Sequence, residues 1–273
     1  MMVKIEFIGE DAALVLETEG RRFLILSDLH LGYEVELARE GIYFPNQLPN
    51  ILERVLKLLE NYGVDTLVLL GDVKHRVAGV SWRESRQVVE LLQKLKNNVN
   101  EIIITPGNHD AGIMSLAGNM ARVVSGRGFR IGEVWMLHGH CWPPPQAADA
   151  KLIIIGHTHP MISLARGPGS RRKVFLAMKT SRSRFVRGLA GKIWEAKKAE
   201  YRSTRGEVRL LVLPHFNNAL QGVELSQLLE GGRGISPLLR SGIFSLSDAS
   251  ILLLDGSRLG SVEWYVRSGG FWQ

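Results

Sequence analysis

The sequence predicts an α/β protein whose strands are largely parallel. Five short apolar runs resemble buried strands: Phe23 to Leu26, Thr66 to Leu70, Ile102 to Thr105, Val134 to Leu137 and Leu152 to Ile155. Two segments with helical periodicity lie between the first three runs, at Leu48 to Leu59 and at Val88 to Leu95. Strands that alternate with helices need crossover connections, and such connections join parallel strands.

Prolines agree with this order of elements. Pro45 and Pro49 flank the start of the first helical segment, where a missing N–H does little harm. The run Pro143, Pro144 and Pro145 predicts a rigid connector between the fourth and the fifth strand.

The length and composition favour one domain. The chain has 273 residues, of which 45% are hydrophobic, and this is enough to bury one large core. We expect a single domain over residues 1–273, in which a core over 1–165 carries the motifs. The region 166–273 then completes the fold or caps the cleft.

Nothing in the sequence indicates an oxidising compartment or a membrane. Cys141 is the only cysteine, so no intramolecular disulfide can form. Acidic residues interrupt the N-terminal segment, which therefore lacks the apolar stretch of a signal peptide. No apolar run approaches the length of about 20 residues that spans a bilayer. We expect a cytoplasmic protein without membrane association.

The chain is basic, with a formal net charge of +7 and a pI near 9.7. Basic residues are dense in the stretch 166–209, at Arg171, Arg172, Lys173, Lys179, Arg182, Arg184, Arg187, Lys192, Lys197, Lys198, Arg202, Arg205 and Arg209. This stretch either contacts a nucleic-acid backbone or forms a solvated surface. Its aromatic candidates for base stacking are few, at Phe185, Trp194 and Tyr201, so both interpretations stay open.

Polar side chains follow each of the five apolar runs. They are, in chain order, Asp28 and His30; Asp72 and His75; Asn108, His109 and Asp110; His138 and His140; and His157 and His159. The ends of parallel strands collect at one edge of a sheet, where loops are free to bind ligands. We therefore expect these side chains to lie close together.

Their donor atoms favour a metal centre. Imidazole nitrogens and carboxylate oxygens without thiolates suit Mn, Fe, Zn or Co, and the oxygen ligands argue against a closed structural zinc site. Each short pattern alone is as frequent in ordinary turns as in metal sites. Five such patterns in a row predict metal binding, because independent turns do not each place His, Asp or Asn after a strand.

These blocks resemble the signature of the calcineurin-like metallophosphoesterases, which runs D-x-H, G-D-x-x-D/H, G-N-H-D/E, H-G-H and G-H-x-H. All five stand here in order, over positions 28 to 159. Within the superfamily the chain is similar to the archaeal SbcD-related phosphoesterases, through SDLHLGYE, GDVKH, LHGH with prolines after it, IIIGHTHP and LPHFNNALQG.

The resemblance implies a four-layer α-β-β-α sandwich with mixed sheets and a dinuclear site. Asp28, His30 and His159 would bind one divalent ion, Asn108, His138 and His157 the other, and Asp72 would bridge the two. His109 matches the catalytic histidine, which meets the substrate or the leaving group. The expected ions are two Mn²⁺, with Fe, Zn, Co or Ni as alternatives.

Residues around these blocks leave questions open. His75 stands where phosphoprotein phosphatases have an acid that orients the catalytic histidine, which favours phosphodiester substrates. Asp110 either supplies that missing charge or merely forms a turn. His140 is expected beside the ligands, His215 at a turn that caps a strand, and Cys141 as a small buried side chain.

The predicted function is metal-dependent hydrolysis of phosphoesters, with phosphodiesters of nucleic acid or nucleotides as substrates. Two ions side by side can lower the pKa of a shared water and neutralise a phosphate. One alternative is a phosphomonoesterase for nucleotides or small molecules. A second is a scaffold or binding protein that kept this fold and lost turnover, against which the complete ligand set and His109 argue.

Overall fold

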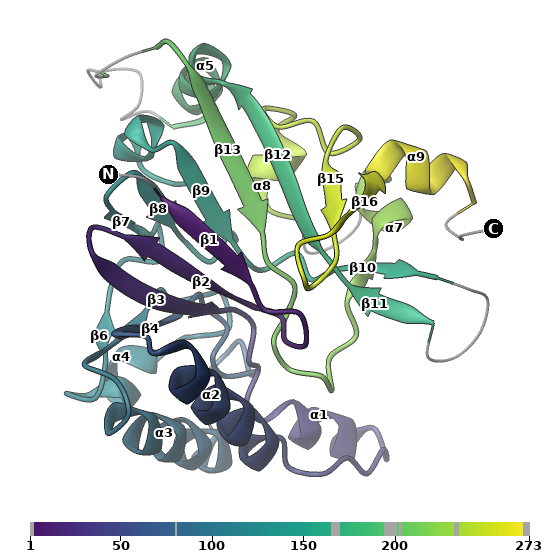
Figure 1. The fold of residues 1–273 in the computed structure, drawn as a ribbon. Helices are drawn as coiled ribbons and strands as arrows, with labels where there is room; N and C mark the ends of the chain where they lie inside the picture. Colours follow the sequence, from purple (N-terminus) through teal and green to yellow (C-terminus); the bar gives the residue numbers. More distant parts are fainter. Residues whose placement is uncertain are drawn as a thin grey trace.

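The computed structural model describes residues 3–79, 81–164, 170–193, 201, 204–231 and 235–269 (Figure 1). Two β-sheets pack face to face, and helices cover the outer face of each, so the layers run helix, sheet, sheet, helix. The predicted α/β class with mixed sheets is confirmed.

The first sheet has the order β1-β2-β3-β4-β5-β6. Its strands are β1 (Lys4–Phe7), β2 (Ala13–Thr18), β3 (Arg21–Leu26), β4 (Thr66–Leu69), β5 (Glu101–Ile104) and β6 (Arg122–Val123). The first three strands pair antiparallel, whereas β3, β4, β5 and β6 pair parallel. The predicted parallel arrangement therefore holds for the strands that precede the first three motif loops.

The second sheet has the order β16-β15-β12-β13-β9-β8-β7. Its strands are β7 (Phe129–Ile131), β8 (Val134–Met136), β9 (Leu152–Ile155), β12 (Phe175–Ser181), β13 (Glu207–Val212), β15 (Ser250–Leu252) and β16 (Arg258–Ser261). A small third sheet joins β10 (Pro160–Ser163), β11 (Arg171–Lys173) and β14 (Val223–Glu224). The region after residue 165 thus supplies strands that pair, through β13, with the motif-bearing strand β9.

The helices fall into two groups. On the first sheet lie α2 (Leu48–Tyr62), α3 (Trp82–Lys96) and α4 (Ile113–Ala117), and α1 (Tyr33–Arg39) lies to the side of α2 and α3. On the second sheet lie the 3₁₀ helix η1 (Pro145–Asp149), α5 (Arg182–Lys192), α7 (Leu225–Leu229), α8 (Pro237–Arg240) and α9 (Val262–Arg267).

The central strands are apolar on both faces because each face has its own core. In β3, Leu24 and Leu26 pack with the helices of the first layer, whereas Phe23 and Ile25 pack against the second sheet. Side chains alternate across a strand, so a continuous apolar run is what a strand between two layers requires. The same alternation in β4 and β5 explains why these strands were visible in the sequence.

The two predicted helices are confirmed, and both are longer than predicted. Pro49 lies in the first turn of α2, and Gly63 ends this helix in the left-handed conformation. The helix α3 begins at Trp82 instead of Val88 because Ser81 and Glu84 form a capping box, in which each side chain accepts from the other's backbone N–H.

Candidate metal centre

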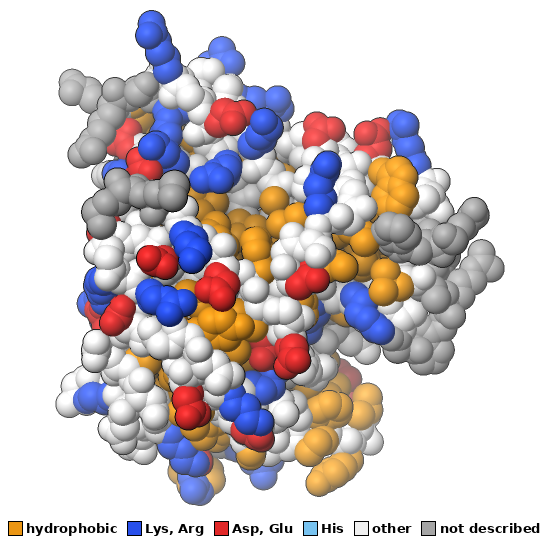
Figure 2. Space-filling model, in the orientation of Figure 1, with side chains coloured by type: hydrophobic (Ala, Val, Ile, Leu, Met, Phe, Trp, Pro, Cys, Tyr) orange, Lys and Arg blue, Asp and Glu red, His pale blue; other side chains and the backbone are white. Residues whose placement is uncertain are grey.

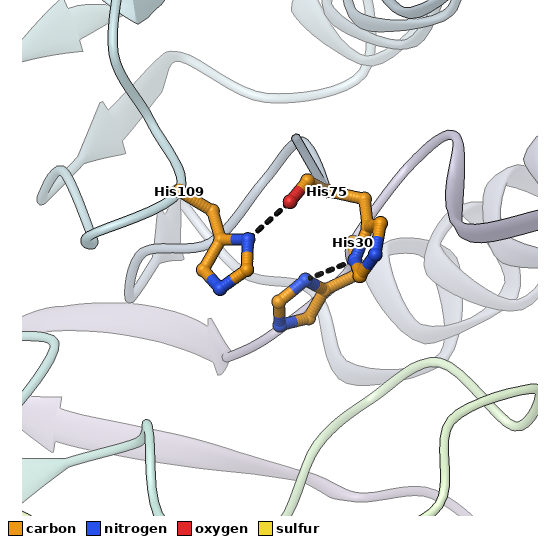
Figure 3. A group of neighbouring side chains, drawn as sticks. All are labelled: His30, His75 and His109. Atoms are coloured by element: carbon orange, nitrogen blue, oxygen red, sulfur yellow. Dashed lines mark hydrogen bonds between the residues drawn. The ribbon is translucent and has the colours of Figure 1, made fainter. Parts of the chain in front are cut away.

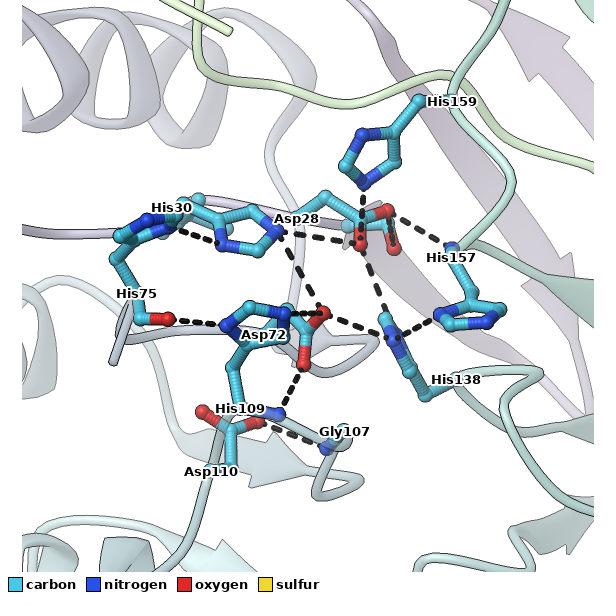
Figure 4. A network of polar contacts seen from close by, with 12 residues as sticks. Asp28, His30, Asp72, His75, Gly107, His109, Asp110, His138, His157 and His159 are labelled. Atoms are coloured by element: carbon cyan, nitrogen blue, oxygen red, sulfur yellow. Dashed lines mark hydrogen bonds and ion pairs between the residues drawn. The ribbon is translucent and has the colours of Figure 1, made fainter. Parts of the chain in front are cut away.

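The five motif loops converge at one edge of the sandwich, beyond the carboxyl ends of β3, β4, β5, β8 and β9 (Figure 4). Seven predicted site residues meet there in one network of contacts: Asp28, His30, Asp72, His109, His138, His157 and His159. Asn108 lies on an exposed turn between Gly107 and His109, whose backbones both approach Asp72.

Asp28, His30 and His159 form one group, whose ligand atoms all lie within 4.8 Å of one another. Nε2 of His159 is 3.0 Å and Nε2 of His30 is 4.0 Å from Oδ1 of Asp28. These three atoms are buried and have no hydrogen-bond partner among the described residues. Buried polar atoms are normally paired, so a cation fits this position.

Asp72, His138 and His157 form a second group of the same size. Nε2 of His138 lies 3.2 Å from Oδ2 of Asp72 and 3.2 Å from Nδ1 of His157. Nδ1 of His138 donates to the carbonyl of Leu70 at 2.8 Å, which leaves Nε2 free to ligate a metal.

Each carboxylate uses one oxygen for protein donors and presents the other to the histidines. Oδ2 of Asp28 accepts from the Ser27 hydroxyl at 2.5 Å and from the His157 N–H at 3.1 Å. Oδ1 of Asp72 accepts from the His109 N–H at 2.9 Å, and Oδ2 also lies 3.5 Å from Nε2 of His30. Asp72 therefore faces both groups, as a bridging carboxylate would.

The backbone is strained at these positions. Asp28, His30, Asp72, His157 and His159 all have positive φ, between 43° and 69°, and Glu19 is the remaining described non-glycine residue of this kind. Asp and His tolerate the left-handed region better than most residues, yet it costs about 1–3 kcal/mol each. Strain that collects at one site indicates a functional geometry held by the surrounding fold.

Three glycines allow the loops to approach this closely. A Cβ at Gly107 would lie 2.1 Å from Oδ1 of Asp72, and one at Gly156 would lie 1.7 Å from Oγ of Ser27. A Cβ at Gly71 would lie 2.5 Å from the ring of His138. These motif glycines are thus required by close packing, and Gly71 also has a positive φ.

Charge is balanced within the cluster. Burial alone would raise the pKa of Asp28, but His159 and His138 hold it well below its ordinary value. Burial would also raise the pKa of Asp72, which His138 and His30 lower. Burial would lower the pKa of His138, but Asp72 and Asp28 raise it to about 9. Both carboxylates are therefore ionised at neutral pH, as metal ligands must be.

His109 borders the cluster at a greater distance, with Nε2 at 3.9 Å from Oδ2 of Asp72. Its Nδ1 donates to the backbone carbonyl of His75 (Figure 3), so the ring is oriented by a neutral acceptor. Its side chain is 20% exposed, whereas that of His138 is fully buried. His109 can therefore meet a substrate from the solvent side.

The ring of His75 lies beside both His30 and His109, and it stacks on the His109 ring with centroids 5.5 Å apart. Nδ1 of His75 lies 3.0 Å from Nδ1 of His30, and Nε2 of His75 lies 2.9 Å from a carboxylate oxygen of Glu36 on α1. The sequence did not predict this contact. The chain from carboxylate to histidine to histidine orients His30 so that its Nε2 faces the cluster.

Asp110 forms a turn and does not supply charge to His109. Its buried carboxylate accepts from the N–H groups of Val73, Lys74 and Gly107. Of the two predicted roles, the structure supports the turn, which ties the third motif loop to the second.

His140 and Cys141 lie beside the cluster. The ring of His140 is 5.4 Å from that of His138, and burial together with His138 lowers the pKa of His140 to about 4. Cys141 is half-buried, and burial raises the pKa of its thiol. His140 therefore packs against a candidate ligand as a neutral ring, as predicted for a neighbour of the ligands.

His215 is a residue whose position the sequence interpretation missed. It is fully buried, its ring lies 5.1 Å from that of His159, and neither ring nitrogen has a partner among the described residues. The reason is topological: β13 pairs parallel with β9, so the segment after β13 reaches the same edge as His157 and His159. In the sequence, an apolar run that ends at Leu213 precedes His215, just as an apolar run precedes each of the five motif blocks.

Of the described part of the basic stretch 166–209, Lys173 lies near this edge, where it donates to the carbonyls of Phe216 and Asn217, whereas α5 lies far from it. Register places Ser181 opposite Glu207 and Leu176 opposite Val212, so α5 begins at the end of the sheet far from the cluster. Arg182 is buried and donates to the carbonyl of Ala148, and Lys179 pairs with Glu207 at 3.2 Å. In Figure 2 the basic side chains over β12 and β13 are interspersed with acidic ones. Trp194, Lys197, Lys198 and Arg202 lie outside the described residues.

No helix in the described ranges is long and apolar enough to cross a membrane.

A four-layer α/β sandwich with a buried histidine and aspartate cluster at the carboxyl ends of its strands is the arrangement of a metallophosphoesterase. Residues 21–141 match the sequence profile of the family described as calcineurin-like phosphoesterase. The chain therefore contains a calcineurin-like phosphoesterase domain, and this family implies divalent metal ions. The narrower similarity to SbcD-related proteins stays a prediction.

One solved structure supports this fold, and a second is similar to part of the chain. Pseudomonas putida nuclease MPE matches with a TM-score of 0.51 and 18% identity, over 93% of this chain and 98% of that one. The phosphoesterase Yfce from E. coli matches with a TM-score of 0.35 and 20% identity, over 56% of this chain and 86% of its own. No curated protein matches the chain.

Proposed function

We propose that this protein hydrolyses phosphodiester bonds of nucleic acid or nucleotides with two divalent ions. Asp28, His30 and His159 would hold one ion, and Asn108, His138 and His157 the other, with Asp72 between them. The observation that carries the proposal is the set of buried, unpartnered ligand atoms that face one another at Asp28, His30 and His159. We expect Mn²⁺ as the ion.

Asp72, His138 and His109 have different roles in the proposed reaction. Two bound ions supply a water of lowered pKa and neutralise the charge of the phosphate. Asp72 faces both groups of side chains and would hold a place between the ions, and the hydrogen bond from His138 to the carbonyl of Leu70 keeps Nε2 of His138 toward the site. Nδ1 of His109 carries the proton that it donates to the carbonyl of His75. Nε2 is therefore the ring atom that would exchange a proton with the leaving oxygen.

Two features support a diester over a phosphoprotein. His75 replaces the acid that phosphoprotein phosphatases of this family place near the catalytic histidine, and its side chain orients His30 instead. The net charge of +7 attracts partners rich in phosphate.

The test is hydrolysis after chelation and reconstitution. An aryl phosphodiester and the matching monoester are assayed with EDTA-treated protein, with and without added Mn²⁺. We expect metal-dependent turnover, with the diester preferred, and at least a 100-fold loss in Asp72→Asn. The control is Asp255→Asn, an exposed aspartate in a turn that asparagine also forms. Turnover of neither ester, or an unaffected Asp72→Asn, would exclude the proposal, and preference for the monoester would favour a phosphomonoesterase.

A further inference from the structure

A second candidate site lies on the second sheet, away from the five motif loops. A cavity of about 510 Å³ opens there over β12, β13, β15 and β16, and its lining includes three basic side chains, Lys179, Arg209 and Arg258. Asp248 is the acidic member of the described lining. In Figure 2, Lys and Arg side chains surround a recessed, partly hydrophobic surface over these strands. We call the cavity and these four residues the β12–β13 site.

The strand register brings like charges together at this site. Lys179 and Arg209 are direct partners in the antiparallel pair of β12 and β13, so their Cβ atoms lie about 5 Å apart. Ala177 shares a face with Lys179 and pairs with Ser250 of β15, whose hydroxyl accepts from Nε of Arg258 at 3.2 Å. Like charges directly opposite each other in a sheet are destabilising, and an anion between them would remove this repulsion.

The neighbouring acids leave these cations accessible to a ligand. Nζ of Lys179 lies 3.2 Å from a carboxylate oxygen of Glu207, but the two side chains are 71% and 61% exposed. Such an exposed ion pair contributes little and can exchange with other ions. The exposed side chain of Arg209 makes no hydrogen bond or ion pair within the part of the chain that the structure describes. With Asp248 as its acid, the cavity therefore keeps an excess of positive charge.

The distance from the metal centre suits a polymer and not a small molecule. Arg209 precedes His215 by six residues, which span at most about 20 Å at 3.3 Å per residue of strand. The ring of His215 lies 5.1 Å from that of His159, a candidate metal ligand. A stacked nucleic-acid strand rises about 3.4 Å per nucleotide, so about six nucleotides cover this separation. One strand can therefore contact both places, whereas a mononucleotide cannot.

We propose that the β12–β13 site binds backbone phosphates of a nucleic-acid strand whose scissile bond lies at the metal centre. A guanidinium and an ammonium side by side suit phosphate oxygens, with which they form charge-assisted hydrogen bonds. Such contacts hold the strand without reading its sequence. The inference rests on the proposed function and deepens it, because it assigns a strand of several nucleotides as the substrate.

The experiment measures fluorescence anisotropy of a labelled oligothymidylate of about 12 nucleotides with the EDTA-treated full chain, between about 50 and 200 mM salt. The double variant Lys179→Gln with Arg209→Gln should bind about tenfold more weakly. Its plot of log affinity against log salt should also be less steep by about 1.4, because each phosphate contact of a single strand accounts for about 0.7. The matched control is Lys94→Gln with Arg122→Gln, which removes the same charge at exposed, ion-paired positions elsewhere and should keep the wild-type slope.

Arg209→Glu separates binding from folding, because it places an acid opposite Lys179 and so creates a favourable cross-strand pair. Its Tm should equal or exceed that of the wild type, while binding of the oligothymidylate falls at least about tenfold. Wild-type affinity and salt slope in the double variant overturn the assignment. Loss of inorganic phosphate binding with unchanged oligothymidylate binding also overturns it, since the site would then serve free phosphate. Because binding is measured without metal, a failure of hydrolysis leaves this result intact, and hydrolysis with unaffected strand binding removes the β12–β13 site alone.

Discussion

Replacing Gly107 by alanine should disable the metal centre through a single methyl group. The added Cβ would lie 2.1 Å from Oδ1, 2.6 Å from the backbone nitrogen and 2.8 Å from Cγ of Asp72. Ordinary contact begins at 3.4 Å, so Asp72 and Gly107 must move apart by about 1.3 Å. Metal–ligand distances tolerate about 0.2 Å, so the required shift removes Asp72 from a bridging position.

We expect Gly107→Ala to weaken metal binding and metal-dependent hydrolysis at least about 100-fold, because displacing even an outer partner of a ligand costs 10–100-fold. Overpacking should also destabilise the fold by about 1–3 kcal/mol, which leaves it folded. The assay combines metal content by mass spectrometry with kcat/KM on an aryl phosphodiester. Gly191→Ala is the control, since its Cβ meets no atom within 4 Å in the described structure and alanine suits a helix. A Gly107→Ala protein with normal metal content and normal turnover would refute the reasoning.

Three further predictions concern the same centre. His75→Ala should lower metal affinity about 10–100-fold because His30 loses the partner of its Nδ1, and calorimetric titration with Mn²⁺ checks this; an unchanged affinity would show that the contact is incidental. Adding Mn²⁺ at 100 times its Kd to EDTA-treated protein should stabilise the fold by about 2.7 kcal/mol, which is measured as a rise in Tm. Mg²⁺ at the same concentration is the comparison, and no rise with Mn²⁺ would mean that the native state has no site for it. Because Asp72 and Asp28 raise the pKa of His138 to about 9, the metal must displace a proton there, so metal affinity should fall as pH drops below 9, by up to about tenfold per pH unit. Calorimetric titration with Mn²⁺ at pH 7.5, in buffers of different ionisation enthalpy, counts the protons that are released. A count of zero would contradict the displacement of a proton from His138. In the metal-free protein the same raised pKa stabilises the fold fully below about pH 6.5, and this contribution is lost as pH rises through 9.

The sequence predicted the strands that are buried on both faces, because their apolar runs are continuous. It did not predict β6 or β14, which are two residues long and exist only through pairing with β5 and β10. The strand β12 was also missed, since Lys179 interrupts its apolar residues on the exposed face, and β13 was missed although Leu210 to Leu213 form a continuous apolar run. A strand with one solvated face has polar residues between its apolar ones, so it is harder to recognise in a sequence than a strand between two layers.

For the centre, sequence order predicted which loops converge, whereas side-chain direction had to come from the fold. His75 follows Asp72 by three residues, yet its Nδ1 contacts His30, its ring stacks on that of His109, and its carbonyl accepts from His109. Nε2 of His75 contacts Glu36, which lies on α1 and not in the loop that carries His75. Such contacts depend on the φ and ψ of a strained loop, and composition does not encode them.

The strain itself explains why these loops follow buried strands. Asp28, Asp72 and His157 have left-handed backbones within a few residues of the ends of β3, β4 and β9, which are fully packed on both faces. Asp28 N–H donates to the carbonyl of Gly71, and Gly156 N–H donates to that of His138, so each loop is also held by the next. A rigid sheet edge can impose unfavourable φ values that a mobile loop would relax. The side chains of Asp28, Asp72 and His157 are therefore held in place by the fold itself, and binding of an ion at the proposed site need not supply the free energy that orders them.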